Sequence, residues 1–535
     1  MKHLKKPQEK IQGEMFHDES LGWWASRLSP NALRALQSGW HGVFRRSLLK
    51  LMPAERLGEH FHARLGRPTK ELYSMAGLML IAEFRNLTGE QAAEAYTFDA
   101  SIQYALNLPR DCQYLSPRSV DNYRKKFRED ELAQEVFMEV SARLVKELGL
   151  DISRQRLDST HVLSQMARLG RQQLLAVGVK RFLVQLARHH RGHYESLPEG
   201  MRERYRPGES RLFGMGTAKV RKGEEVIAEI GQDMAALMDR FGSEAKIAAM
   251  ESYRSLARLF AEHFEPPQDA DDPPVKRPKS VTAEGRSTET LQNPSDPDAG
   301  YNGKKGPGYQ AQIAQSLPPR DAEDGIEGPG LIVGLVAQSA SVRDNEALEE
   351  VIAQQKETGL VPKEMTADTI YGSDENVRRC AEAGIELISP VPGRKPEKEQ
   401  PRHFCSKAER VRKDRIEARR LEQETPEWKE RYASRSGIEG LNRALDVVTG
   451  FKRLRVRGIK AVSMALNLKA AGWNITAAAK ILKIRRKKAA MRRREACLGA
   501  FFAMLGKMTK PIAKLAEKDR AVQVDVLLTN LNVVY

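Results

Sequence analysis

The chain has 535 residues, a formal net charge of +17 at pH 7 and 41% hydrophobic residues. This length exceeds one ordinary domain, so two or three units with a large buried core are expected. The longest apolar runs are too short to span a bilayer, the charged first residues lack the apolar core of a secretory signal, and the four cysteines follow no metal-binding spacing. These features argue against a membrane protein, a disulfide scaffold and a structural zinc site, and they fit a reducing cytosol.

The positive charge is concentrated near the C-terminus. Between Val447 and Arg494 the sequence contains 15 Lys or Arg residues and no Asp or Glu, which nearly accounts for the whole excess. Such a run favours nucleic acid as a partner, because each neutralised phosphate releases condensed counterions. The alternative is a solvated basic face that adds solubility. Residues 476–535 are interpreted as a basic C-terminal tail.

The N-terminal part of the chain reads as helical. Residues 1–65 are a partly helical lead-in, and residues 66–148 form a compact helical domain in which Thr88 and Ser116 are predicted N-caps. The last short helix of this domain is basic and carries three predicted DNA contacts: Arg118, Arg124 and Lys125. The pattern fits a helix-turn-helix-like DNA-binding module. An ordinary helical subdomain with a basic face fits it equally well.

The middle of the chain is predicted to contain an α/β domain built from two separated stretches, residues 149–165 and 301–475. The first stretch supplies a strand over residues 151–162, which is expected to bring Asp158 to the end of the sheet, and in the second a further strand ends at Asp368. Residues 166–300 lie between the two stretches and are predicted to form a long helical insertion followed by a Pro- and Asp-rich linker.

Asp158, Asp368 and an acid on a later helix, Glu439, form the predicted catalytic constellation. Hard divalent cations such as Mg²⁺ prefer oxygen ligands, and two such ions can activate a nucleophile and stabilise the leaving oxygen of a phosphodiester. Their ligands must converge from separate rigid elements, as two strand ends and a helix can. Each acid taken alone has a simpler reading as a solvated side chain. The combination with basic surroundings favours a metal site.

The later helix carries further polar residues at helical spacing. Tyr432, Arg435, Glu439, Arg443 and Asp446 stand at offsets 0, 3, 7, 11 and 14, which share one helix face. An arginine one turn before Glu439 can hold a phosphate or orient the carboxylate. The alternative is a surface salt-bridge ladder. The predicted DNA contacts in this region are Tyr432, Arg435, Arg443, Lys452, Arg453, Arg455 and Arg457.

Taken in order, these motifs resemble those of bacterial insertion-sequence transposases with a DDE catalytic domain. Residues 157–160 (LDST) are similar to the family's first-Asp strand, and residues 367–372 (ADTIYG) to its second-Asp motif. Residues 296–299 (DPDA), followed by Gly308-Tyr309, resemble its "DPDA…GY" approach to the second strand. Tyr432, Arg435 and Glu439 fit its Tyr-x-x-Arg-x-x-x-Glu signature.

The resemblance covers roughly residues 60–475, including the helical domain that often precedes the catalytic core. The chain departs from the fuller signature at one position, because Asp446 stands where the family carries a Lys seven residues after the Glu. The long insertion between the first two acids is a second departure.

The resemblance implies a fold and a reaction. The fold is an RNase H-like mixed sheet flanked by helices, interrupted by the helical insertion and preceded by an all-helical domain. The reaction is hydrolysis at the ends of a mobile element, which frees a 3′-OH that attacks target DNA by direct transesterification. Asp158, Asp368 and Glu439 would be the catalytic residues and the ligands of two Mg²⁺ ions, for which Mn²⁺ can substitute. The implied partners are double-stranded DNA, as terminal inverted repeats and target, and a second copy of the chain in a homodimer.

Three other readings use the same residues. An RNase H-like nuclease would cut DNA without joining it, and a DNA-binding regulator derived from a transposase would do neither. An RNA partner is compatible with the charge, although no aromatic stacking motif of the RNA-recognition type is visible. The expected location is the bacterial cytoplasm, in association with the nucleoid.

Overall fold

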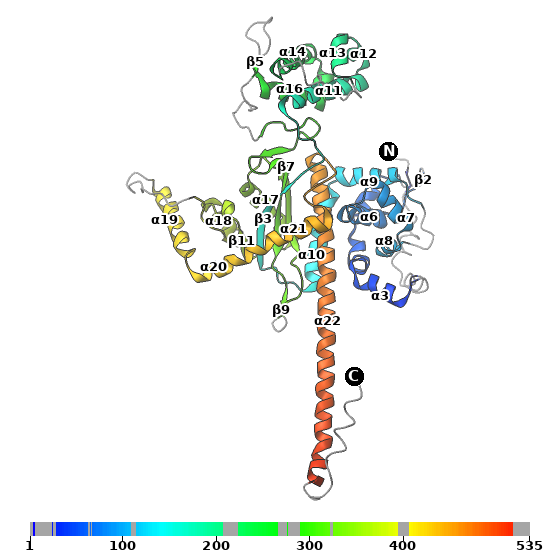
Figure 1. Cartoon of the computed structure of the whole chain (residues 1–535), viewed down its shortest axis with the longest axis vertical. Coiled ribbons are helices and arrows are strands. Elements are labelled where there is room, and N and C mark those ends of the chain that lie inside the picture. Colours follow the sequence, from blue (N-terminus) through cyan, green and yellow to red (C-terminus); the bar gives the residue numbers. More distant parts are fainter. Residues whose placement is uncertain are drawn as a thin grey trace.

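Figure 1 shows the computed structural model of the chain, in which a central sheet is surrounded by helices. The structure describes residues 4–5, 24, 28–62, 65, 67–108, 114–206, 223–265, 275–276, 289–321, 325–393 and 406–516. Within these residues, no helix combines the length and the apolar character that a bilayer crossing requires.

The central sheet has the strand order β10-β7-β3-β11-β12, and β6 pairs with the start of β7. The strands are β3 (Arg154–Val162), β6 (Gly300–Asn302), β7 (Gly306–Ser316), β10 (Ile332–Ser339), β11 (Glu364–Ala367) and β12 (Glu386–Ile388). β7 is antiparallel to both β3 and β10, whereas β11 is parallel to both β3 and β12. This is an RNase H-like arrangement, so the predicted mixed α/β class is confirmed.

Helices of the N-terminal part share one hydrophobic core with this sheet. They are α3 (Pro30–Ser38), α4 (Trp40–Val43), α5 (Ala54–Gly58), α6 (Leu72–Phe84), α7 (Gly89–Phe98), α8 (Ala100–Ala105), α9 (Pro117–Glu129) and α10 (Leu132–Leu148). Thr88 and Ser116 are N-caps as predicted, and Thr88 forms a reciprocal capping box with Gln91.

The insertion forms a second hydrophobic core of its own. Its helices are α11 (Arg171–His189), α12 (Arg191–Glu195), α13 (Glu199–Arg204), α14 (Gly223–Phe241), α15 (Ala245–Ala248) and α16 (Glu251–His263). Figure 1 shows this helical body at the top of the molecule, connected to the ends of β3 and β7. Outside the central sheet, two-residue strands pair as β1 (Leu4–Lys5) with β2 (Arg67–Pro68), β4 (Phe264–Glu265) with β5 (Val275–Lys276), and β8 (Arg320–Asp321) with β9 (Gly325–Ile326).

The remaining helices follow the central strands. They are α17 (Leu348–Thr358), α18 (Asp374–Glu382), α19 (Lys407–Glu422), α20 (Pro426–Ala433) and α21 (Gly437–Thr449), with short 3₁₀ helices at Asp344–Ala347, Thr369–Tyr371 and Ser434–Ser436. The 3₁₀ turn at Ser434–Ser436, labelled η7 below, separates α20 from α21. The sequence had predicted one uninterrupted helix here, with a single polar face.

The basic segment is not a separate tail, because it is part of α22 (Ile459–Ala516), a single 58-residue helix that runs through the predicted boundary at residue 475. Its first half is buried against α6, α10 and β10, and Gly472 permits the close approach to α6, since a Cβ there would lie 2.1 Å from Cβ of Phe84. Residues 489–500 are all exposed, and Figure 1 shows this part projecting from the body.

Candidate active site

Two of the three predicted acids lie side by side. Because β11 is parallel to β3 with Ala367 opposite Leu157, Asp368 follows its strand beside Asp158. Nη2 of Arg435 lies 3.8 Å from Oδ1 of Asp158 and 3.5 Å from Oδ2 of Asp368. One guanidinium therefore bridges both carboxylates, from the turn η7.

The predicted strand over residues 151–162 corresponds closely to β3, but Asp158 does not end it as expected. Asp158 lies in the middle of β3, opposite Ile313 of β7, because the strand continues to Val162 with unbroken pairing to β7. Only Asp368 stands at a strand end. Burial raises the pKa of the Asp158 carboxyl, and the positive charge of Arg435 opposes that rise.

The third predicted acid, Glu439, is exposed on α21. Its carboxylate forms no hydrogen bond or ion pair with the residues that the structure describes. The α21 residue that contacts Asp158 is instead Asn442, three residues later, whose Nδ2 donates to Oδ2 of Asp158 at 3.2 Å. Asn442 is 9% exposed, and its buried Oδ1 has no hydrogen-bond partner within the described chain. Asn442 was not predicted from the sequence, although it lies three residues after Glu439, on the same face of the helix.

A buried arginine of β3 positions the turn that carries Arg435. Arg156 donates from Nε to Oε1 of Gln315 at 2.8 Å and from Nη1 to the carbonyl oxygen of Ser434 at 3.2 Å. Burial lowers the pKa of Arg156 to about 10. Its guanidinium passes so close to Gly437 that a Cβ at that position would lie 1.9 Å from Nη1. A side chain at position 437 would therefore force the hydrogen-bonded guanidinium of Arg156 or the turn to shift, whereas the backbone angles of Gly437 impose no such restriction.

Tyr432 approaches the two carboxylates from α20. Its ring stacks on Trp428, with centroids 4.8 Å apart and planes at 18°. Burial raises the pKa of the Tyr432 hydroxyl, and Arg435 acts in the opposite direction. The same helix is fixed to the sheet by Arg431, which forms ion pairs with Glu364 at 2.8 Å and Glu386 at 2.6 Å. These contacts hold Tyr432 and η7 against the edge of the sheet where β11 and β12 lie.

The backbone at Asp368 is fixed from the opposite direction. The hydroxyl of Ser389, after β12, donates to the carbonyl oxygen of Asp368 at 2.6 Å. Arg419 of α19 donates to the carbonyl oxygens of Gly372 at 2.9 Å and Ser389 at 3.0 Å. The carboxylate is also an N-cap, since it accepts from the backbone N–H of Thr369. The orientation of Asp368 therefore depends on α19 as well as on its own strand.

The DPDA motif has a structural explanation. Asp296 is fully buried and accepts hydrogen bonds from the hydroxyls of Ser164 and Tyr309 and from the backbone N–H of Gly458 at 2.9 Å. Asp298 accepts from the N–H of Ile459 at 2.9 Å, at the start of α22. The motif therefore joins the end of β3, the start of β7 and the last helix.

Asp446, which replaces the family's Lys, also has a structural contact. Its Oδ1 accepts from the backbone N–H of Lys452 at 2.8 Å. This bond stabilises the turn after α21, from which the chain continues alongside Leu163. No described contact connects Asp446 with Asp158 or Asp368.

The predicted DNA contacts fall into three groups. Arg443, Arg453, Arg455 and Arg457 are exposed on α21 and on the segment after it, and Lys452 is half-buried there. On α9, Arg118 is exposed, and Lys125 is exposed near Glu129 at 3.7 Å. Arg124 is instead held within the fold, because its Nη2 donates to the carbonyl oxygen of Leu87 at 2.9 Å and its Nε lies 3.5 Å from Glu83.

The oxygen atoms at the site fit a hard divalent cation. Asp158 and Asp368 supply carboxylates, and Oδ1 of Asn442 is a buried oxygen without a partner. The fit is incomplete in one respect. Among the described residues, no three His, Cys, Asp or Glu side chains are grouped so that they could hold a metal ion. In this arrangement the charge of Arg435 takes the place of a cation between the two carboxylates.

Comparison with known families decides what kind of domain holds this site. Residues 269–475 match the family model described as the transposase DDE domain. The chain contains a transposase DDE domain. The matched range includes Asp368 and Glu439 but begins after Asp158, which reaches the site because β3 lies between β7 and β11 in the sheet. No curated protein and no solved structure matches the chain. Over residues 269–475 the chain is therefore similar to a domain of transposases, a family that acts on DNA.

Proposed function

We propose that this transposase cleaves phosphodiester bonds at the ends of an insertion sequence and joins the freed 3′-OH to target DNA. The observation that supports this reaction most directly is the pairing of Asp158 with Asp368 on adjacent strands, bridged by Arg435. Two carboxylates and a guanidinium at one point can position a phosphodiester and control the protons of its attacking and leaving oxygens.

Each residue has a separate role in this proposal. Asp158 and Asp368 bind the reactive centre, and Glu439 joins them from α21 when DNA is bound. Arg435 moves from the carboxylates to a phosphate oxygen, which its planar guanidinium can bind with two parallel hydrogen bonds. Tyr432 limits the directions that Arg435 can take. Asn442 holds the carboxylate of Asp158 in place.

The residues that would hold divalent metal ions are Asp158, Asp368 and Glu439, with Oδ1 of Asn442 as a further oxygen. Two Mg²⁺ ions, or Mn²⁺ in their place, would supply Lewis-acid stabilisation of the charge that develops on the phosphodiester oxygens. The raised pKa of Asp158 fits this proposal, because burial of a carboxylate is costly until a cation compensates for it.

DNA would bind across the exposed basic residues after α21 and along the projecting part of α22. Arg443, Arg453, Arg455 and Arg457 line the first part of this path, and Arg118 and Lys125 of α9 are candidates for contacts to a second segment of the duplex. Arg124 is the weakest of the predicted contacts, since the fold already uses its guanidinium. Two ends must be paired before they are joined, so the proposal includes a homodimer.

The reaction is tested with the purified full-length chain, duplexes that carry the candidate terminal repeats, Mg²⁺ and a target plasmid. The parent should yield joined products, and Asp158→Asn should yield neither cleavage nor joining while its duplex affinity stays within about twofold. Cleaved but unjoined DNA from the parent would instead indicate a nuclease. Equal cleavage by the parent and by Asp158→Asn would refute the assignment of the site.

A further inference from the structure

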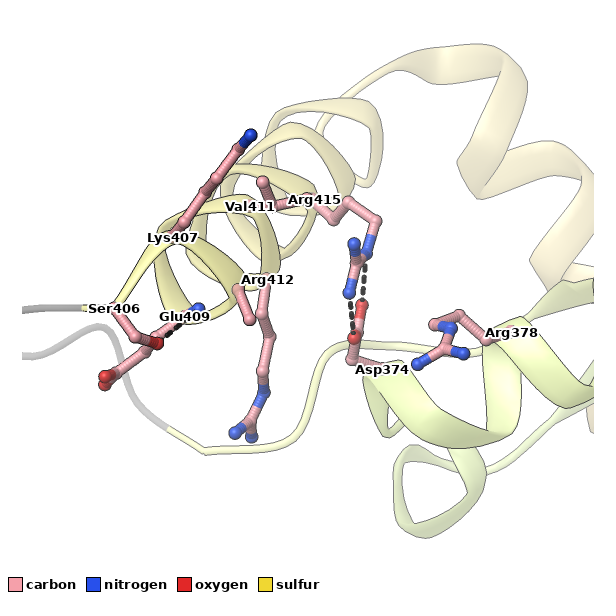
Figure 2. Close-up of a pocket in the computed structure, with 9 residues that line it drawn as sticks. Asp374, Arg378, Ser406, Lys407, Glu409, Val411, Arg412 and Arg415 are labelled. Atoms are coloured by element: carbon pink, nitrogen blue, oxygen red, sulfur yellow. Dashed lines mark hydrogen bonds and ion pairs between the residues drawn. The ribbon is translucent and has the colours of Figure 1, made fainter.

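A basic groove lies on the side of the catalytic site away from α22. It has a volume of about 810 Å³ and lies between the start of α18 and the first turns of α19. Figure 2 shows its lining side chains, with Asp374 held by Arg415 and with Arg378 and Arg412 extending into the open space nearby. None of these residues belongs to the predicted site.

The carboxylate of Asp374, in the groove, is already neutralised from within the fold. Asp374 forms two hydrogen bonds with Arg415, at 3.0 and 2.6 Å, and this pairing lowers the pKa of its carboxyl. Glu409 lies 3.8 Å from Nζ of Lys413, one turn along α19. Asp374 therefore needs no further cation, whereas the exposed Glu409 is only weakly paired.

The arginines that remain are exposed and weakly engaged. Arg412 forms no ion pair with any residue that the structure describes. Arg378 has only a surface contact to Glu382 at 3.7 Å, in which both side chains are more than 60% exposed, and contacts of this kind contribute little. Arg378 and Arg412 interact with Asp374 only electrostatically, because Arg415 holds that carboxylate, so both guanidinium groups can still bind an anionic ligand.

The groove is rigidly connected to the catalytic strand. Its acid, Asp374, begins α18 six residues after Asp368, and Arg419 attaches α19 to the carbonyl oxygens of Gly372 and Ser389. A duplex bound across Asp368 would therefore have this groove at a fixed position along its backbone.

We infer that the groove between α18 and α19 binds the sugar-phosphate backbone of the DNA duplex at the catalytic site, through Arg378 and Arg412. Guanidinium groups suit phosphate oxygens because they donate parallel hydrogen bonds in a fixed geometry. The groove is open to solvent, which suits a continuous polymer better than an enclosed small molecule. This inference rests on the proposed function only in taking duplex DNA as the ligand.

The test is duplex binding without cleavage. The full-length chain is titrated against a fluorescent 30-base-pair duplex in EDTA over a range of KCl concentrations. The double variant Arg378→Gln/Arg412→Gln should bind on the order of tenfold more weakly at 0.1 M salt. Its slope of log K against log salt should be shallower by about 1.8, since each lost phosphate contact removes about 0.9.

The matched control is Lys356→Gln/Lys363→Gln, which removes the same charge from two exposed positions, one in the last turn of α17 and one directly before β11. It should keep the parent's slope. The variant Arg378→Lys/Arg412→Lys should restore most of the slope, because the charge is retained. The inference is overturned when the double variant and the control have the same affinity and slope. Since no metal and no cleavage are involved, this result is independent of whether Asp158→Asn abolishes the reaction.

Discussion

The amide of Asn442 donates a hydrogen bond to the carboxylate of Asp158 across 3.2 Å, from a helix that is 284 residues away in the sequence. This contact joins the middle of β3 to the helix that carries Glu439. It also leaves one buried oxygen of Asn442 unpaired at the site. The orientation of the Asp158 carboxylate, which is proposed to be catalytic, thus depends on a neutral side chain.

Asn442→Ala should therefore lower end cleavage by about 10- to 100-fold, the usual cost of removing a residue that orients a catalytic carboxylate or metal ligand. Duplex affinity should not change, because Asn442 is buried. Single-turnover cleavage and fluorescence anisotropy measure the two quantities. Val447→Ala, at an exposed position on the same helix, is the control and should cleave at the parent's rate. Parent-like cleavage by Asn442→Ala would exclude this role.

Gly437→Ala should impair catalysis through Arg156. The added methyl group would lie 1.9 Å from the guanidinium, so either Arg156 or η7 must move, and Arg435 would move with the turn. We expect at least a tenfold loss of cleavage and a lower melting temperature. Gly440→Ala is the matched control on the same helix, because a Cβ there meets nothing within 4 Å. That variant should keep full activity and gain about 0.5–1 kcal/mol of stability. Equal behaviour of the two variants would contradict the argument.

Glu439→Gln tests whether Glu439 joins the site when DNA is bound. In the structure its carboxylate contacts neither Asp158 nor Asp368, so the substitution should leave stability within about 0.5 kcal/mol of the parent, as is usual for an exposed position. Cleavage should nevertheless fall by more than 100-fold if Glu439 holds a metal ion in the DNA complex. Mg²⁺ titrations of cleavage give a second readout, because the variant should need a higher concentration. A variant with the parent's rate and Mg²⁺ dependence would remove Glu439 from the site.

Lys469 should make stability depend on pH. Its ammonium group is buried where α6, α21 and α22 meet, and it donates to the carbonyl oxygens of Glu83 and Thr449. Burial lowers its pKa to about 8, whereas an unfolded lysine has a pKa of about 10.4. Between these values the unfolded state binds more protons, so stability should rise with pH.

The expected gain between pH 7.5 and 9.5 is about 2 kcal/mol, and Lys469→Met should lack it. Urea denaturation of both proteins at the two pH values measures the difference. Lys483→Met, which removes an exposed lysine of the same helix, should keep the parent's pH dependence. If the free energy of unfolding of Lys469→Met rose with pH as much as that of the parent, Lys469 would not be the cause of the pH dependence.

Local sequence signals were sufficient for much of the fold. Thr88 and Ser116 are N-caps because their side chains satisfy N–H groups only a few residues away. Asp368 ends its strand as predicted, since an apolar run gives way there to polar residues.

The errors arose where contacts between distant segments decide the outcome. The end of the first strand near Val162 was predicted correctly, but Asp158 was expected at the end of the sheet and lies in the middle of β3, opposite Ile313 of β7. The role of Asn442 depends on a neighbour that spacing along one helix does not reveal. The basic segment was read by its charge, whereas its buried apolar residues, such as Val462, Leu466 and Ile481, make it the start of a long core helix.

The hydrogen bond between Ser164 and Asp296 has a consequence for how the chain tolerates its insertion. The two residues stand where the chain leaves β3 and where it returns toward β7, and Nδ2 of Asn293 also donates to the carbonyl oxygen of Ala167 at 2.9 Å. The insertion of more than 120 residues therefore begins and ends at two segments that are hydrogen-bonded to each other. The entropy of closing such a loop grows only with the logarithm of its length. We therefore expect that a short linker in place of the insertion would leave the pairing register of β3 and β7 unchanged.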